Sequence, residues 1–176
     1  MEMRGEVRRG YFVAGLAGAQ FALPEAVERL RAARDDPDAP WVVIAASDPA
    51  NPYRVVTGTG TRDPLHRPRG AGALLVTRRG RVALAVEGRG RRVRVSADME
   101  DADLTSAAAA LAAYLTGAAR ELRLASAVRR RVPLLETIDG EPAANARAST
   151  AFRAAGYRRG GTGLEYPDAA IVTPAG

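Results

Sequence analysis

Lysine and cysteine are both absent from this chain of 176 residues, and histidine and tryptophan occur once each. Without cysteine there is no disulfide and no thiolate metal site, and one histidine cannot build a multi-histidine zinc site. Without lysine there is no Gly-Lys-Ser/Thr phosphate loop, so ATP hydrolysis by the usual P-loop is excluded. No apolar run reaches the ~20 residues that a membrane span requires, which excludes a transmembrane protein.

The first residues lack the apolar stretch of a secretory signal, and the absence of cysteine agrees with a reducing compartment. We therefore expect a cytoplasmic protein. The length suits one domain or slightly more, in which about 70% of the unfolded chain's surface is buried on folding. The one histidine, His66, lies in a stretch rich in glycine, proline and threonine. We expect a solvated loop histidine there rather than a catalytic one, and no bound metal.

The positive charge of the chain is unevenly distributed. All 26 basic residues are arginine, against 20 acidic residues, which gives a net charge of +6. Part of this excess reflects the codon bias of a GC-rich genome, so the total is a weak indicator of a nucleic-acid partner. The distribution is more informative, because residues 65–97 contain nine arginines and one acid, a net charge of +8, whereas residues 35–64 carry −3.

Guanidinium groups bind phosphates through paired hydrogen bonds without reading bases, so affinity for DNA should fall steeply with salt. We expect the arginines to gather along one side of a curled β-structure. The alternative is that they only keep the edges of a sheet from aggregating. The candidate nucleic-acid-binding residues are Arg8, Arg9, Arg67, Arg69, Arg78, Arg79, Arg81, Arg91, Arg92 and Arg94.

Residue patterns predict an α+β fold. Residues 6–15 are expected to form a β-hairpin that turns at Arg8-Arg9-Gly10, and a helix should begin at Pro24 and end before Pro37. Val82, Leu84 and Val86 are expected to share one face of a strand. The other predicted elements are a buried strand at 41–46, an antiparallel meander at 71–77, 81–87 and 92–97, helices at 104–115 and 145–155, and strands at 121–127, 134–138 and 161–166.

Many short antiparallel strands joined by glycine turns are typical of closed or strongly curved sheets, because closure removes exposed edges. We therefore predict a small antiparallel β-barrel or a curled sheet with two or three flanking helices, preceded by the hairpin. The predicted boundaries are 1–36 for the hairpin and linking helix, 37–167 for the barrel-like module and 168–176 for a flexible tail.

Six stretches of the sequence together resemble one protein family. They are RGEVRRGYFVAGL at residues 4–16, AQFALPEAV at 19–27, SDPANPY at 47–53, RPRGAGAL at 67–74, IDGEP at 138–142 and FRAAGY at 152–157. They resemble the C-terminal region of large helicase-related (Lhr) proteins, bacterial superfamily-2 DNA helicases. The first two stretches are similar to the wing of a winged helix and the helix that follows it.

The resemblance implies an ATPase core far upstream, followed by tandem winged-helix modules and a final β-barrel module, in an arrangement similar to AlkZ-type DNA glycosylases. ATP and magnesium would bind only in that core, so this chain is expected to need no cofactor. Residues 4–15 would be the wing of a winged helix whose recognition helix is missing, which makes the chain a fragment or the product of a truncated gene. The family is linked to DNA repair and to 3′-to-5′ unwinding of DNA or RNA–DNA hybrids.

Three functions remain open. The first is a non-catalytic nucleic-acid-binding and scaffolding module, associated with the nucleoid, whose partners are single-stranded or duplex DNA, or an RNA–DNA hybrid, and upstream winged-helix modules. The second is an assembly or oligomerisation module, which predicts exposed apolar surface around Phe12, Leu16 and Phe21. The third is part of a DNA glycosylase, for which Gln20, Glu165 and Asp168 carry suitable amide or carboxylate groups.

Overall fold

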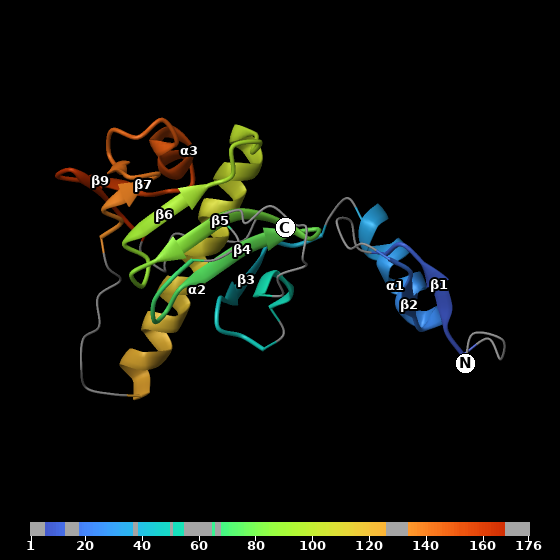
Figure 1. The fold of residues 1–176 in the computed structure, drawn as a ribbon. Helices are drawn as coiled ribbons and strands as arrows, with labels where there is room; N and C mark the ends of the chain where they lie inside the picture. The colour runs from blue at the N-terminus through green and yellow to red at the C-terminus, as the bar shows by residue number, and fades with distance from the viewer. Residues whose placement is uncertain are drawn as a thin grey trace.

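The computed structural model describes residues 6–12, 18–36, 39–49, 51–54, 65, 68–125 and 134–167. It has the predicted α+β architecture, with a six-stranded sheet, two small two-stranded sheets and, within the described residues, three α-helices. Figure 1 shows the chain from its N-terminal strands and helix, drawn in blue, to the C-terminal elements in orange and red, which lie at the far side of the central sheet. The predicted tail at 168–176 lies outside the described residues.

The N-terminal unit consists of β1 (Arg8–Gly10), β2 (Gln20–Ala22) and α1 (Pro24–Asp35). The expected turn at Arg8-Arg9-Gly10 is wrong, because these residues form β1 and pair antiparallel with β2, with Arg8 opposite Ala22. The side chain of Gln20 supports this pairing, since its Oε1 accepts a hydrogen bond from the backbone N–H of Phe12 at 2.7 Å. The helix was predicted correctly, with Pro24 in its first turn, where no intrahelical N–H bond is lost.

The central sheet has the strand order β3-β4-β5-β6-β7-β8. The predicted meander is confirmed, because β4, β5 and β6 pair antiparallel in sequence order. β3 extends it by pairing antiparallel with β4. β7 pairs parallel with β6, which the sequence did not indicate. The sheet is open, with β3 and β8 at its edges, so no closed barrel forms within the described residues. The strands are β3 (Val42–Ala45), β4 (Leu74–Arg78), β5 (Arg81–Glu87), β6 (Arg92–Val95), β7 (Thr137–Ile138) and β8 (Glu141–Pro142).

Position in the sheet corrects one burial prediction. Val42 to Ala45 form β3 as expected, but Val42 is 47% exposed because β3 is an edge strand. The chain then forms a short 3-10 helix, η2 (Pro52–Arg54). Within it, the backbone N–H of Tyr53 donates to Oδ1 of Asn51, and the side-chain amide N–H of Asn51 donates to the carbonyl of Ala46. Residues 51–54 are thereby tied to the end of β3.

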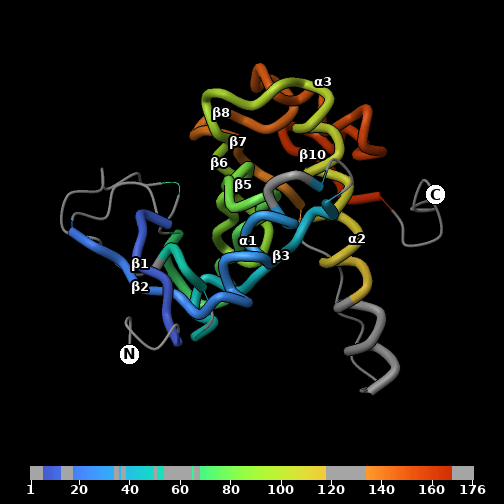
Figure 2. Tube along the Cα trace, turned by 90° about the vertical axis from the view of Figure 1, so that its right-hand side faces the viewer, coloured from blue at the N-terminus to red at the C-terminus, as the bar shows by residue number. Residues whose placement is uncertain are grey.

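Helix α2 (Asp101–Ala125) covers one face of the sheet, as Figures 1 and 2 show. Leu104, Ala108 and Leu111 pack from this helix against inward-facing residues of β4, β5 and β6, such as Leu84. The predicted helix at 104–115 is confirmed but too short, and the strand predicted from residue 121 is wrong, since residues 121–125 are helical. Alanine, arginine, glutamate and leucine in this stretch all favour a helix, and this preference outweighs the short alternating pattern.

The opposite face of the sheet carries a smaller apolar cluster that includes Leu65, Leu75 and Val82. The expectation that Val82 shares a face with Leu84 is wrong, because the register of β4 and β5 shifts between them. Val76 is opposite Leu84 but the next residue, Thr77, is opposite Val82, so Ala83 is an extra residue in β5. Such a β-bulge reverses the side-chain alternation, which places Val82 on the second face.

The C-terminal segment closes the core. It contains α3 (Ser149–Ala154), shorter than the predicted helix, and the antiparallel pair β9 (Arg158–Gly160) and β10 (Gly163–Glu165). The ring of Phe152 is fully buried and meets Tyr157 edge-on, 5.2 Å between ring centres. The Tyr157 hydroxyl donates to the carbonyl of Ala108 in α2 at 3.0 Å. None of the helices in the described part of the chain is long and apolar enough to cross a membrane.

Candidate nucleic-acid interface

The turn between β4 and β5 places three arginines at one end of the sheet. We name Arg78, Arg79 and Arg81 the β4–β5 cluster. Arg78 ends β4 and Arg81 begins β5, so the connection consists of Arg79 and Gly80. Both have positive φ, 51° and 74°, as a tight type I′ hairpin turn requires. Arg79 is exposed at the tip of this turn.

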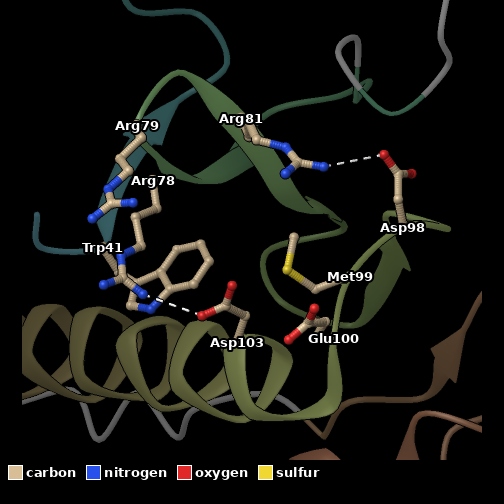
Figure 3. Close-up of a pocket in the computed structure, with 8 residues that line it drawn as sticks. All are labelled: Trp41, Arg78, Arg79, Arg81, Asp98, Met99, Glu100 and Asp103. Carbon is tan, nitrogen blue, oxygen red and sulfur yellow. Dashed lines mark hydrogen bonds and ion pairs between the residues drawn. The ribbon is translucent and has the colours of Figure 1, made fainter. Parts of the chain in front are cut away.

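Arg78 serves the packing of the module. Its Nη1 lies 3.2 Å from Oδ1 of Asp103, in the first turn of α2. Its Nε donates to the carbonyl of Ala39 at 2.9 Å, and its guanidinium lies 5.5 Å from the centre of the Trp41 ring (Figure 3). One side chain therefore joins the β4–β5 turn, the segment before β3 and the start of α2.

A cavity of about 370 Å³ opens between this turn and the start of α2. In it Arg81 Nη2 lies 3.2 Å from Oδ2 of Asp98, and the buried Nε1 of Trp41 has no hydrogen-bond partner in the described part of the chain. Three arginines and three carboxylates line the cavity, so the lining has no net charge to attract a phosphate. The lining residues are Trp41, Arg78, Arg79, Arg81, Asp98, Met99, Glu100 and Asp103 (Figure 3).

A second group of arginines lies at the other end of β5. The connection to β6 contains Gly88, Arg89 and Gly90, with φ values of 60°, 58° and 96°. Arg89 is exposed, and no acidic partner for it is found among the described residues. The stretch before β4 lies against this turn, because a Cβ added to Gly72 would be only 3.0 Å from Cγ of Arg89. We name the β5–β6 cluster by its five arginines: Arg69, Arg89, Arg91, Arg92 and Arg94.

Glu87 organises this cluster from the last position of β5. Its Oε1 accepts the backbone N–H of Arg69 at 2.9 Å and Nη2 of Arg94 at 3.0 Å, and its Oε2 lies 3.8 Å from Nε of Arg92. The Glu87 side chain is only 20% exposed. One half-buried carboxylate thus holds two guanidinium groups and one loop backbone in place.

Arg91 has a different partner. Its Nε donates to Oε1 of Glu136 at 2.9 Å, and its Nη2 donates to the same oxygen. The hydrogen bond with Arg91 lowers the pKa of Glu136 and raises the pKa of Arg91. The Arg91 backbone is fixed as well, because its carbonyl accepts the N–H groups of Glu136 at 2.7 Å and of Thr137 at 3.2 Å. The pair lies at the surface, so it adds little to stability.

The arginines therefore form two separate clusters rather than the single surface that the sequence predicted. The six residue steps of β5 separate them by roughly 20 Å. In the β4–β5 cluster three arginines face Asp98, Glu100 and Asp103. In the β5–β6 cluster five arginines face Glu87 and Glu136, which leaves an excess of three positive charges. Antiparallel pairing causes the split, since consecutive turns lie at opposite ends of a sheet.

The other predicted arginines lie elsewhere. Arg8 and Arg9 are exposed on β1, and Arg8 Nη1 lies 3.6 Å from Oε1 of Glu28 in α1. Arg67 lies outside the described residues. The N-terminal unit also exposes apolar side chains, of which Tyr11 is 82% and Phe21 59% accessible.

Two residues at this end of the sheet, Arg89 and Glu87, were not among the predicted site residues. Arg89 is the exposed cation at the tip of the turn, and Glu87 is the acceptor that holds the cluster together. Glu87 was recognisable in the sequence as the lone acid among the nine arginines of residues 65–97. Glu136 was not, because it lies 45 residues from Arg91 and only the parallel pairing of β6 with β7 brings them together.

The residues considered for glycosylase chemistry do not converge in the described part of the chain. Gln20 bonds to the backbone of Phe12, Glu165 is exposed at the end of β10, and Asp168 lies outside the described residues. No group of three or more histidine, aspartate or glutamate side chains within the described residues is placed to hold a metal ion.

Comparison with known proteins identifies relatives of both parts of the chain. Residues 1–42 match the family model of the winged-helix domain of the large helicase-related protein. A protein of Mycolicibacterium smegmatis named "Lhr helicase/ probable uracil glycosylase" is 46% identical over 125 residues, which is 68% of this chain and 8% of that protein. The Escherichia coli K12 protein named "Lhr helicase/uracil glycosylase" is 33% identical over 175 residues, 94% of this chain and 10% of that protein. The chain thus spans at most a tenth of the length of these curated relatives.

Proposed function

We propose that this chain, which belongs to the large helicase-related (Lhr) family, is a non-catalytic nucleic-acid-binding and scaffolding module of an ATP-dependent DNA-repair helicase. Its partners would be DNA or an RNA–DNA hybrid, which places it at the nucleoid in the cytoplasm. The observation that carries the proposal is the β5–β6 cluster, an exposed turn with three positive charges in excess of its acidic partners. The predicted division at residue 36, into a winged-helix part and a sheet module, belongs to the same proposal.

Phosphate binding at this cluster needs little rearrangement. Arg91, Arg92 and Arg94 have acidic partners, but their side chains are 55%, 56% and 37% exposed. Exposed ion pairs contribute only about 0–1 kcal/mol, so an approaching phosphate competes for these guanidinium groups. A guanidinium binds a phosphate through two parallel hydrogen bonds, which are shorter and stronger than neutral ones. Sequence preference is not expected, because such contacts position a nucleic acid without reading its bases.

The test is fluorescence anisotropy with labelled 20-nucleotide single-stranded and duplex DNA at 50 and 200 mM salt. Two to five phosphate contacts predict that affinity falls between about 10-fold and 500-fold over this range. A peptide nucleic acid of the same base sequence is the control, since it carries no phosphate and should not bind. Micromolar or weaker binding with no dependence on salt would reject the proposal.

An assembly role is a second candidate, and the exposed apolar residues of the N-terminal unit favour it. Tyr11, Phe21, Leu23 and Leu30 are each more than half exposed, and they belong to the segment that contains β2 and α1 or directly precedes it. Apolar surface gathered in this way commonly marks an interaction site. The partner would be a winged-helix module of the full-length protein or a second copy of the chain.

Light scattering and a pull-down with an upstream winged-helix fragment test this second function. We expect self-association or capture of the fragment, and we expect Phe21→Gln to weaken it. The sheet module, in which Phe152 is buried, should take no part in this binding. A clean monomer that fails to bind the fragment would contradict an assembly role.

The relatives' names also include uracil glycosylase, and we propose that this segment alone does not release bases. The support is that Gln20 is engaged with the backbone of Phe12 and that Glu165 is exposed at the end of β10. Incubation of the chain with uracil-containing and alkylated DNA, beside an Asp168→Asn variant, is expected to release no base. Release by the wild type that is lost in Asp168→Asn would assign the activity to this chain.

A further inference from the structure

We infer that the β5–β6 cluster is the phosphate-binding site of the module, with Arg89 and Arg69 in direct contact with a phosphodiester, and that the β4–β5 cluster is structural. This inference rests on the proposed nucleic-acid-binding function and assigns it to one end of the sheet. The two turns resemble each other in sequence, as Arg78-Arg79-Gly80-Arg81 and Gly88-Arg89-Gly90-Arg91. What distinguishes them is the set of neighbours that the fold places beside each.

The first argument is the balance of charge. At the β4–β5 cluster Asp98, Glu100 and Asp103 match the three arginines, and the fold uses Arg78 to hold the start of α2. At the β5–β6 cluster Glu87 and Glu136 face five arginines. The second site has the larger excess of arginines over acidic partners, so a phosphate meets the stronger attraction there.

The second argument is the placement of Arg69 and Arg89. The backbone of Arg69 is bound to Glu87, and the stem of Arg89 lies against Gly72, so both arginines approach the same side of the turn. Arg89 is exposed at the tip of the turn, between two glycines of positive φ. Glu87 accepts Arg94 and lies near Arg92, but neither it nor Glu136 is paired with the guanidinium of Arg69 or Arg89 in the described residues.

The third argument is rigidity. The Tyr166 hydroxyl donates to the carbonyl of Gly90 at 2.7 Å, and the carbonyl of Arg91 accepts two N–H groups from the segment around β7. The turn is therefore held from the C-terminal segment and from the sheet at once. A site that is already ordered loses little conformational entropy on binding, which favours affinity.

The experiment uses two matched substitutions, Arg89→Gln and Arg79→Gln, in the full chain. Both arginines are exposed, both have positive φ, 58° and 51°, and each substitution removes one charge. In the anisotropy titration with 20-nucleotide DNA, Arg89→Gln should raise Kd about 3- to 10-fold at 50 mM salt and reduce the log–log salt slope by about 0.9. Arg79→Gln should change Kd less than twofold. Arg69→Gln with Arg89→Gln should reduce the slope by about 1.8.

A further variant, Arg89→Lys, separates charge from folding. It keeps the positive charge and should keep the salt slope of the wild type. Equal losses in Arg79→Gln and Arg89→Gln, or no loss in the double variant while the wild type binds DNA, would overturn the inference and leave the proposed function intact. A wild-type chain that shows no salt-dependent binding would refute the proposed function, and the inference with it.

Discussion

The N-terminal unit and the sheet module bury their apolar residues to very different extents. Among the described residues of the unit of β1, β2 and α1, Val27 is the only buried hydrophobic residue, and Phe21, Leu23 and Leu30 are more than half exposed. In the module, two apolar clusters cover both faces of the sheet, and Phe152 and Leu111 are inaccessible. The comparison indicates that the module supplies most of the buried core of the chain, while the N-terminal unit leaves apolar side chains exposed.

The largest expected effect separates the two regions with one type of substitution. Phe152→Ala should destabilise the chain by about 3–5 kcal/mol, since it removes a fully buried ring and leaves a cavity. Phe21→Ala, the matched control, should change stability by less than about 0.5 kcal/mol, because Phe21 is exposed. Urea denaturation followed by circular dichroism measures both. Equal losses would mean that Phe21 is buried in solution.

A smaller effect is expected where the C-terminal segment meets α2. Tyr157→Phe keeps the ring but removes the hydroxyl that donates to the carbonyl of Ala108 in the buried core. The carbonyl lies within α2 and keeps its helical N–H partner, so the loss of this second hydrogen bond should cost about 0.5–1.5 kcal/mol in the free energy of unfolding. The same denaturation experiment tests this, and an unchanged midpoint would show that the hydrogen bond contributes nothing net.

High pH should weaken the same region. Burial raises the pKa of Tyr157 well above its ordinary value, and it raises the pKa of Tyr166 as well. Each phenol stays neutral in the folded chain while it ionises in the unfolded chain at about pH 10. Their contribution to stability is therefore complete below about pH 10 and is lost as the pH rises further toward the folded pKa values. The unfolding midpoint should be lower at pH 11 than at pH 8. This difference should be smaller in Tyr157→Phe than in the wild type.

The smallest effect on stability is expected in α1. Leu30 is 52% exposed, so Leu30→Gln should leave the unfolding free energy within about 0.5 kcal/mol of the wild type. It should nevertheless reduce self-association or binding of a winged-helix fragment, measured by light scattering at several concentrations. A large loss of stability in the monomer would contradict the proposed division between the two regions.

Local patterns explain which elements were predicted correctly. The meander of β4, β5 and β6 follows from alternating apolar residues separated by arginine-glycine turns, and α1 follows from Pro24 at its start. The pairing of β1 with β2 was missed because residues 11–19 separate the partners in the sequence, and Arg8-Arg9-Gly10 is as suitable for a turn as for a short strand. The bulge at Ala83 was missed because nothing in the sequence distinguishes it from its alanine neighbour two residues on.

The sequence by itself determined the α+β class, the meander, the concentration of arginine in residues 65–97 and the family to which the chain is related. Only the tertiary structure decided which of these arginines keep their charge available. Asp103 reaches Arg78 across 25 residues and Glu136 reaches Arg91 across 45. Charge along a chain is a local property, but its neutralisation depends on long-range pairing of strands and helices, which no spacing between nearby residues encodes.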